Sequence, residues 1–118
     1  MSKKRRDKDS LGDIQEAVEM VSIYTKGFTY RKFLQDRKTQ DAVVRNFEVI
    51  GEAAKNISKD LKAEYPGVEW KSIAGLRDKL IHFYFGIDYK IVRNIAGKEL
   101  PKLRKQIRAI LKQESELT

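Results

Sequence analysis

Arg77 and His82 are the residues of this chain whose types and spacing are best suited to chemistry, because His82 is the only histidine among 118 residues. An unperturbed histidine titrates at about pH 6.5 and can therefore accept or donate a proton near neutral pH. An arginine remains charged and presents a planar fork of N–H groups that fits the oxygens of a phosphate. Together the two side chains could supply proton transfer and positive charge at one phosphate group.

The elements that must position these residues are inferred from the apolar pattern around them. A helix is expected from about residue 68 or 69 to Phe85, because the apolar residues repeat at helical spacing and a glycine follows. On such a helix Arg77 and Tyr84 point almost the same way, inside a wide apolar arc, and His82 points about 140° away from Arg77. Arg77 must therefore lean towards His82, or a second copy of the helix must complete the site.

Each of these residues also has an ordinary structural explanation. A histidine near a helix end often caps the helix or lies on the surface. Arg77 can pair with a carboxylate such as Glu52, which avoids the cost of a buried unpaired charge. Tyr84 can be a core aromatic residue whose hydroxyl finds a partner. Residue types and spacing alone leave these explanations open beside the catalytic one.

The sequence RDKLIHFY, residues 77–84, also has the pattern Arg-x4-His-x-Tyr. This pattern resembles the signature of the HEPN superfamily, in the form carried by the HepT toxins. The similarity in order and spacing covers roughly residues 11–111. It includes further blocks at DAVV (41–44), GEAA (51–54), Trp70 followed by IAGLR (73–77), and LPKL (100–103).

The resemblance implies an all-α homodimer that acts as an endoribonuclease toxin without a metal or another cofactor. It implies that Arg77 and His82 are catalytic, in a cleft across the dimer axis, and that Glu52 faces this cleft. The implied partner is a minimal nucleotidyltransferase of the MntA type, an antitoxin that transfers AMP to Tyr84. Asp78 departs from the family pattern and would add a negative charge to the cleft beside the histidine.

Two other classes of function remain compatible with these residues. The first is a non-catalytic HEPN helical module that binds a nucleotide or docks onto a nucleotidyltransferase, in which Arg77 holds phosphate and His82 is structural. The second is a basic RNA-binding protein without cleavage activity. RNA cleavage in the presence of a chelator, lost in both Arg77→Ala and His82→Ala, would separate the toxin from both.

The composition indicates a basic chain with no signal for a membrane or a metal. The formal net charge of +8 favours an anionic partner such as RNA, DNA or an acidic protein, although a basic tail that only aids solubility explains it equally well. Without cysteine, neither a disulfide nor a thiolate zinc site is available. No apolar run approaches the roughly 18 residues of a membrane span, and no apolar stretch follows the basic start, so a soluble cytoplasmic protein is expected.

The chain divides into a disordered basic arm, residues 1–9, and a single helical domain, residues 10–118. The domain is expected to be all-α, an up-and-down bundle of four to five helices. Ser10 is expected to cap a first helix that ends near Gly27, and Thr39 to cap a second long helix with a heptad-like apolar stripe.

The second half of the chain gives further boundary signals. A break is expected near Ser58, before the turn signal Tyr-Pro-Gly at residues 65–67. Asp88 is expected to cap a short helix that ends at Gly97. Pro101 then falls in the first turn of a final amphipathic helix, where a missing N–H is tolerated.

Two stretches combine cations in a way that suits nucleic acid. Residues 28–39 read as a connection with a helical turn, and its aromatic residues could stack on bases, although a solvated loop is the other explanation. The cations of the final helix form the second candidate track. The first stretch contains Tyr30, Arg31, Lys32, Phe33, Arg37 and Lys38, and the second contains Lys102, Arg104, Lys105, Arg108 and Lys112.

Overall fold

The computed structural model describes the backbone of residues 3–82 and 86–116, and their side chains except at 3, 4, 77, 80–82, 86, 87 and 116. The helices of the first half are α1 (Lys3–Thr25), α2 (Tyr30–Gln35), α3 (Arg37–Asn56), α4 (Lys59–Glu64), α5 (Trp70–Ala74) and α6 (Leu76–Leu80). A two-residue pair, β1 (Ile81–His82) and β2 (Gly86–Ile87), follows. The chain ends with α7 (Tyr89–Asn94), the π-helical turn η2 (Ile95–Glu99) and α8 (Leu100–Glu116).

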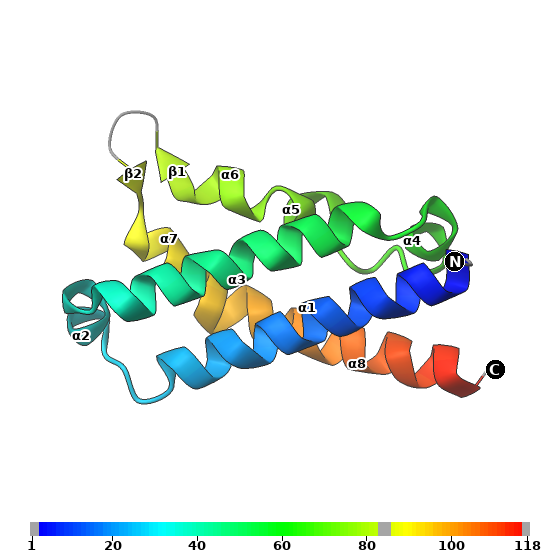
Figure 1. Cartoon of the computed structure of the whole chain (residues 1–118), viewed down its shortest axis with the longest axis horizontal. Helices are drawn as coiled ribbons and strands as arrows, with labels where there is room; N and C mark the ends of the chain where they lie inside the picture. The colour runs from blue at the N-terminus through cyan, green and yellow to red at the C-terminus, as the bar shows by residue number, and fades with distance from the viewer. Residues whose placement is uncertain (1–2, 83–85, 117–118) are drawn as a thin grey trace.

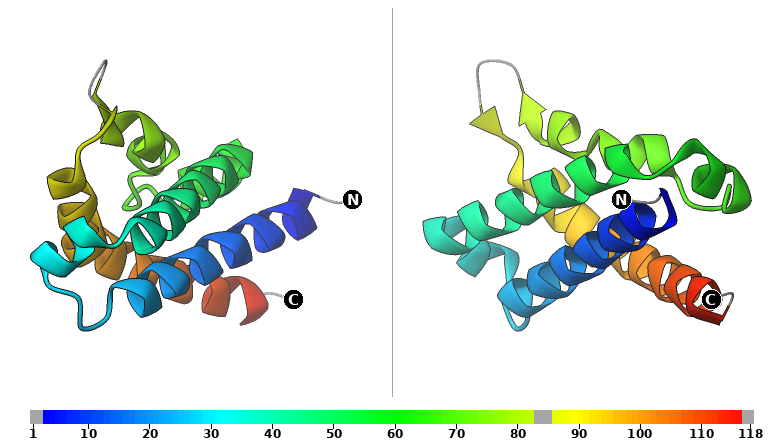
Figure 2. Two further views of the ribbon diagram at one scale, coloured as in Figure 1. Left: turned by 60° about the vertical axis from the view of Figure 1, so that its left-hand side comes forward. Right: turned by 45° about the vertical axis from the view of Figure 1, so that its right-hand side comes forward.

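The long helices α1, α3 and α8 form the body of the molecule, which is 46 Å long (Figure 1). The helix α1 runs opposite to α3 and α8, the α5–α6 stretch returns along α3, and α7 continues through η2 into α8 (Figure 2). Apolar residues three and four apart put one face of each long helix into a shared core. The prediction of an all-α up-and-down bundle is confirmed. The core residues of the long helices include Leu11, Ile14, Val18, Val21, Val43, Phe47, Ile50, Leu103, Ile107 and Ile110.

The N-terminal segment differs from the expected disordered arm, because α1 already includes residues 3–9. Asp7 is 6% exposed and accepts hydrogen bonds from the backbone N–H and the hydroxyl of Ser58, at 2.8 and 2.5 Å. Ser58 in turn caps α4 by accepting from the N–H of Leu61 at 3.2 Å. Ser10 is therefore a buried residue inside α1 and not its N-cap.

The start of α3 also differs from the sequence expectation by a few residues. Asp36, and not Thr39, is the N-cap: its carboxylate accepts from the backbone N–H of Thr39 at 3.0 Å. This hydrogen bond lowers the pKa of Asp36 from its ordinary value. The preceding connection contains one short helix, α2, as expected, and Gly27 before it has a positive φ of 75° that suits the end of α1.

The prediction of a single helix from residue 68 or 69 to Phe85 is wrong. The chain divides there into α5, which ends at Ala74 with Gly75 as its C-cap, and α6, which ends at Leu80; residues 81–82 are then extended. The extended backbone pairs antiparallel, with Ile81 opposite Ile87 and His82 opposite Gly86, so Gly86 lies in a strand and does not end a helix. Residues 83–85 lie outside the described part of the chain.

The helix that begins after Asp88 continues further along the chain than the sequence predicts. Asp88 caps α7 as predicted, by accepting from the N–H groups of Lys90 and Ile91. The helix does not end at Gly97, because η2 carries it into α8, where Pro101 lies in the first turn. Ile95 and Leu100 are both buried, and an α-helix would turn residues five apart about 140° away from each other. The wider π turn keeps both on the core side. In the described part of the chain, no helix has the length and apolar character needed to cross a membrane.

Candidate active site in the HEPN-like segment

The structure places Arg77 and His82 on different elements. Arg77 is the second residue of α6, and His82 is the second residue of β1. The angle of about 140° expected between them on one helix therefore does not apply. The side chains of both residues, and the whole of Tyr84, lie outside the described part of the structure.

Glu52 and Asp78 are brought together, because they line one cavity of about 320 Å³ between α3 and α6. Glu52 is exposed on α3 and lies 3.8 Å from the ammonium group of Lys55, as an i,i+3 pair. Asp78 is exposed on α6, one residue after Arg77. Glu52 therefore pairs with Lys55 on its own helix and also lies beside the segment that contains Arg77.

Gly51 explains how closely α3 approaches the segment that leads to Arg77. A Cβ atom at this position would lie 3.2 Å from the carbonyl oxygen of Ala74 and 3.5 Å from that of Ile73. Contacts of this length are tighter than most Cβ contacts, so a larger residue would push α5 away. The end of α5 thus rests on the backbone of α3, three residues before Arg77.

The charge in this cavity is mixed and more negative than positive. Its described lining contains four carboxylates and two cations, and Arg45 lies 3.7 Å from Glu48 in an ion pair. A surface with this balance would not attract a phosphate by itself. The described residues of this cavity therefore do not form a phosphate site by themselves. The charged residues of the lining are Asp13, Arg45, Glu48, Glu52, Lys55 and Asp78.

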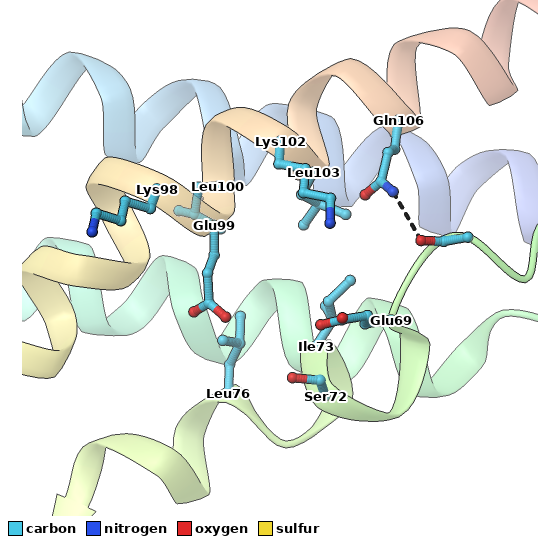
Figure 3. A pocket seen from close by; sticks show the side chains of 11 residues that line it. Glu69, Ser72, Ile73, Leu76, Lys98, Glu99, Leu100, Lys102, Leu103 and Gln106 are labelled. Atoms are coloured by element: carbon cyan, nitrogen blue, oxygen red, sulfur yellow. Dashed lines mark hydrogen bonds between the residues drawn. The ribbon is translucent and has the colours of Figure 1, made fainter.

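A second cavity, of about 340 Å³, lies on the other side of α5, against η2 and α8 (Figure 3). Glu69 and Glu99 extend into it, and the side-chain amide of Gln106 donates to the carbonyl of Gly67 at 3.0 Å across one end. Leu76, which directly precedes Arg77, is buried on its wall. Neither Glu52 nor Asp78, the two predicted site residues whose side chains the structure describes, lines this cavity.

Sequence reasoning missed a group of cations on α7 and η2. Lys90, Arg93 and Lys98 line a wide cavity together with Tyr30 of α2. In the sequence, the only sign of this group was three cations, three and five residues apart, after the Asp88 cap. The proximity of Tyr30 follows only from the fold. Phe33, which was expected to stack on bases with Tyr30, is instead buried. Its ring packs edge to face against Tyr89, with 5.8 Å between the ring centroids.

Among the described residues, no group of three or more His, Asp or Glu side chains could hold a metal ion. The side chain of His82 is not one of these described side chains.

A model of the family described as "Ribonuclease HepT-like" matches residues 14–110. This match covers most of the chain and includes both the GEAA block of α3 and the segment with Arg77 and His82. The chain belongs to the HepT-like ribonuclease family.

Curated relatives agree with this HepT-like assignment. The "Probable ribonuclease HepT" of Thermococcus cleftensis is 45% identical over 101 residues, which cover 86% of this chain and 92% of the relative. The "Putative RNase MJ0127" of Methanocaldococcus jannaschii is 48% identical over 102 residues, which cover 86% of this chain and 84% of the relative. No solved structure matches the chain. The part of α1 before residue 14, with the Asp7 contact, lies outside the HepT-like match.

Proposed function

We propose that this chain is a metal-independent endoribonuclease in which Arg77 and His82 are the catalytic residues. The observation that carries the proposal is the HepT-like ribonuclease match over residues 14–110, which contains the only histidine of the protein. The net charge of +8 agrees with a polyanionic substrate.

The proposed reaction transfers the phosphodiester to the 2′-OH of the same RNA strand. A base removes the 2′-OH proton, the 2′ oxygen attacks phosphorus, and the bond from phosphorus to the 5′ oxygen breaks. An acid gives a proton to the leaving 5′ oxygen, so the products carry a 2′,3′-cyclic phosphate and a 5′-OH. The histidine serves as the base or the acid, and the arginine stabilises the charge on the transition state.

A homodimer completes this chemistry in the proposal, because one histidine cannot be base and acid in the same step. A two-fold axis would bring two copies of Arg77 and His82 to one cleft. The fold supports a site made from two elements, because α6, with Arg77, packs against α3 and α7, whereas β1, with His82, pairs with β2. Glu52 and Asp78 are proposed to border the cleft.

Regulation is proposed to act on Tyr84. A minimal nucleotidyltransferase would transfer AMP from ATP to the tyrosine hydroxyl, with release of pyrophosphate. The added phosphate, two residues after His82, would occupy the positive site and repel the RNA backbone. The chain would then be the toxin of a toxin–antitoxin pair and the nucleotidyltransferase its antitoxin.

Cleavage of RNA in the presence of a chelator tests the catalytic proposal. The parent protein should release 2′,3′-cyclic phosphate ends, and Arg77→Ala and His82→Ala should each lower the rate by about 10²–10⁴. Arg6→Ala is the matched control and should cleave like the parent, because Arg6 is an exposed arginine of α1 outside the HepT-like match. Full cleavage by His82→Ala, or cleavage only with added metal, would contradict the mechanism. RNA binding without cleavage by the parent would favour the non-catalytic HEPN module.

The dimer and the modification have separate tests. Light scattering should give twice the chain mass, and an active monomer would contradict the shared cleft. Co-expression with a nucleotidyltransferase should add the mass of one or more AMP groups to the parent and none to Tyr84→Phe. Addition of AMP to Tyr84→Phe would show that another residue is modified.

A further inference from the structure

A basic groove lies between α2 and the α7–η2 stretch. We define it by the residues that line a cavity of about 560 Å³. Its described lining contains three cations and no carboxylate, in contrast to the two cavities beside α5. Of these three cavities, this is the one whose described cations are not offset by carboxylates in the same lining, so it suits a polyanion best. The lining residues are Tyr30, Lys90, Arg93, Asn94, Gly97 and Lys98.

An aromatic hollow of about 220 Å³ adjoins this groove. Tyr30, Arg93 and Gly97 line both spaces, and the guanidinium of Arg93 lies 5.1 Å from the centre of the Tyr30 ring. Phe28 lines the hollow and is 39% exposed, although it is a large apolar side chain. The other lining residues of the hollow are Thr25, Thr29, Phe33, Val92 and Ala96.

We propose that the basic groove and the aromatic hollow together bind single-stranded RNA. Lys90, Arg93 and Lys98 would contact successive phosphates, and a base would enter the hollow against Phe28 and Tyr30. Single-stranded RNA fits this combination, because a duplex keeps its bases stacked inside and offers none to the hollow. The inference rests on the proposed ribonuclease function and adds a substrate-binding site outside the Arg77–His82 segment.

The position of the groove relates it to the proposed catalytic segment. The helix α7 begins two residues after β2, and β2 pairs with the strand that contains His82. Figures 1 and 2 show α2, α7 and the β1–β2 pair at the same end of the molecule. A strand held in the groove would therefore continue towards this segment, so the groove should act on substrate binding and not on the chemical step.

Gly97 allows the groove to be blocked without removing a charge. A Cβ atom at this position would meet no atom within 4 Å, and its φ is not positive, so a side chain can be added without strain. Gly97→Leu should extend into the space shared by the groove and the hollow. Gly97→Ala is its matched control, because a methyl group favours the helix and leaves most of the space open.

Equilibrium binding of a labelled RNA of about 12 nucleotides with 2′-O-methyl groups tests the inference, because such an RNA cannot be cleaved by its own 2′-OH. Lys90→Ala combined with Lys98→Ala should weaken binding about tenfold or more and lower the salt slope by about 1.4. Lys105→Ala combined with Lys112→Ala, two exposed cations of α8, should have a much smaller effect. Phe28→Ala and Gly97→Leu should weaken binding, and Gly97→Ala should not.

The outcomes distinguish this inference from the proposed function. If the parent binds the RNA through the groove but cleaves no ordinary RNA, the groove stands and the catalytic proposal falls. Equal losses in the groove and α8 variants, unchanged binding by Gly97→Leu, or equal affinity for the annealed duplex would each overturn the groove. Blocking of a protein partner by Gly97→Leu with RNA binding intact would also overturn it. Thermal unfolding of each variant confirms that it is folded before binding is measured.

Discussion

The helix α3 and the segment from residue 70 to 87 use similar lengths of chain in opposite ways. The helix α3 spans 20 residues without a break, and its apolar face forms part of the core. The described part of the second segment is divided among α5 and α6, with five residues each, and two strands of two residues. Helices of five residues are not stable alone, so their positions depend on packing against α3. The helix α3 thus contributes a long apolar face to the core, and the proposed catalytic residues lie on short elements, of which α6 packs against α3.

Phe47→Ala acts on the long helix α3 and should have the largest effect on the free energy of unfolding. Phe47 is fully buried, and loss of its ring should lower the free energy of unfolding by about 3–5 kcal/mol. Urea unfolding followed by circular dichroism measures this loss. RNA cleavage per folded molecule should stay near that of the parent. A loss below about 1 kcal/mol would show that the core closes around the missing ring.

Asp7→Ala should give the next largest loss of stability. It removes a buried carboxylate that holds the Ser58 N–H and hydroxyl, and unfolding should become easier by about 1–3 kcal/mol. Asp9→Ala, an exposed carboxylate two residues later on α1, is the control and should change little. Equal effects of the two substitutions would mean that α1 does not depend on the Ser58 contact.

Gly51→Ala tests whether α3 positions the segment from residue 70 to 87, because Gly51 lies at the contact between the two. The added methyl group gains roughly 0.5–1 kcal/mol of helix preference but meets the Ala74 carbonyl at 3.2 Å, so the net change in stability should be below about 1 kcal/mol. The displaced α5 should lower RNA cleavage. Gly12→Ala, with nothing within 4 Å of its Cβ, should instead stabilise the fold by about 0.5–1 kcal/mol and leave cleavage unchanged. Unchanged cleavage in Gly51→Ala would show that the contact does not position the segment.

Tyr65→Phe should have a similarly small effect on stability at neutral pH, about 1 kcal/mol, through loss of the hydrogen bond of 2.9 Å to Glu114. Burial and this hydrogen bond raise the pKa of Tyr65 to about 12. The folded protein therefore favours the protonated phenol, so this stabilisation is complete below about pH 10 and is lost as the pH rises towards 12. Unfolding midpoints from pH 8 to 12 should fall less steeply for Tyr65→Phe than for the parent. Parallel curves would show that Tyr65 does not contribute.

The sequence was sufficient to predict the long helices, because their buried residues repeat at helical spacing and lie on one face. It could not predict the division of the expected helix at residue 75. A helical wheel assumes one continuous helix and contains no information about the close approach of Gly51 or the pairing of His82 with Gly86. The helical state of residues 3–9 depends in the same way on a contact between Asp7 and Ser58, 51 residues apart.

The candidate site shows the same limit. The family resemblance pointed to Glu52, and the position of Asp78 next to Arg77 pointed to that carboxylate; the fold places both on one cavity. Nothing in the local sequence of Tyr30 pointed to Arg93, because the two side chains meet only when α2 packs beside α7. Local patterns predict elements, and contacts between distant elements decide which side chains share a surface.

The π turn η2 also fixes the relative phase of two helical faces. Because η2 contains one residue more than an α-helical turn would need, Lys90 and Arg93 of α7 are rotated relative to the cations of α8. Deletion of one residue there would restore an α-helical path and turn the α7 face by about 100°. Lys90 and Arg93 would then turn away from the basic groove, although no cation had been removed.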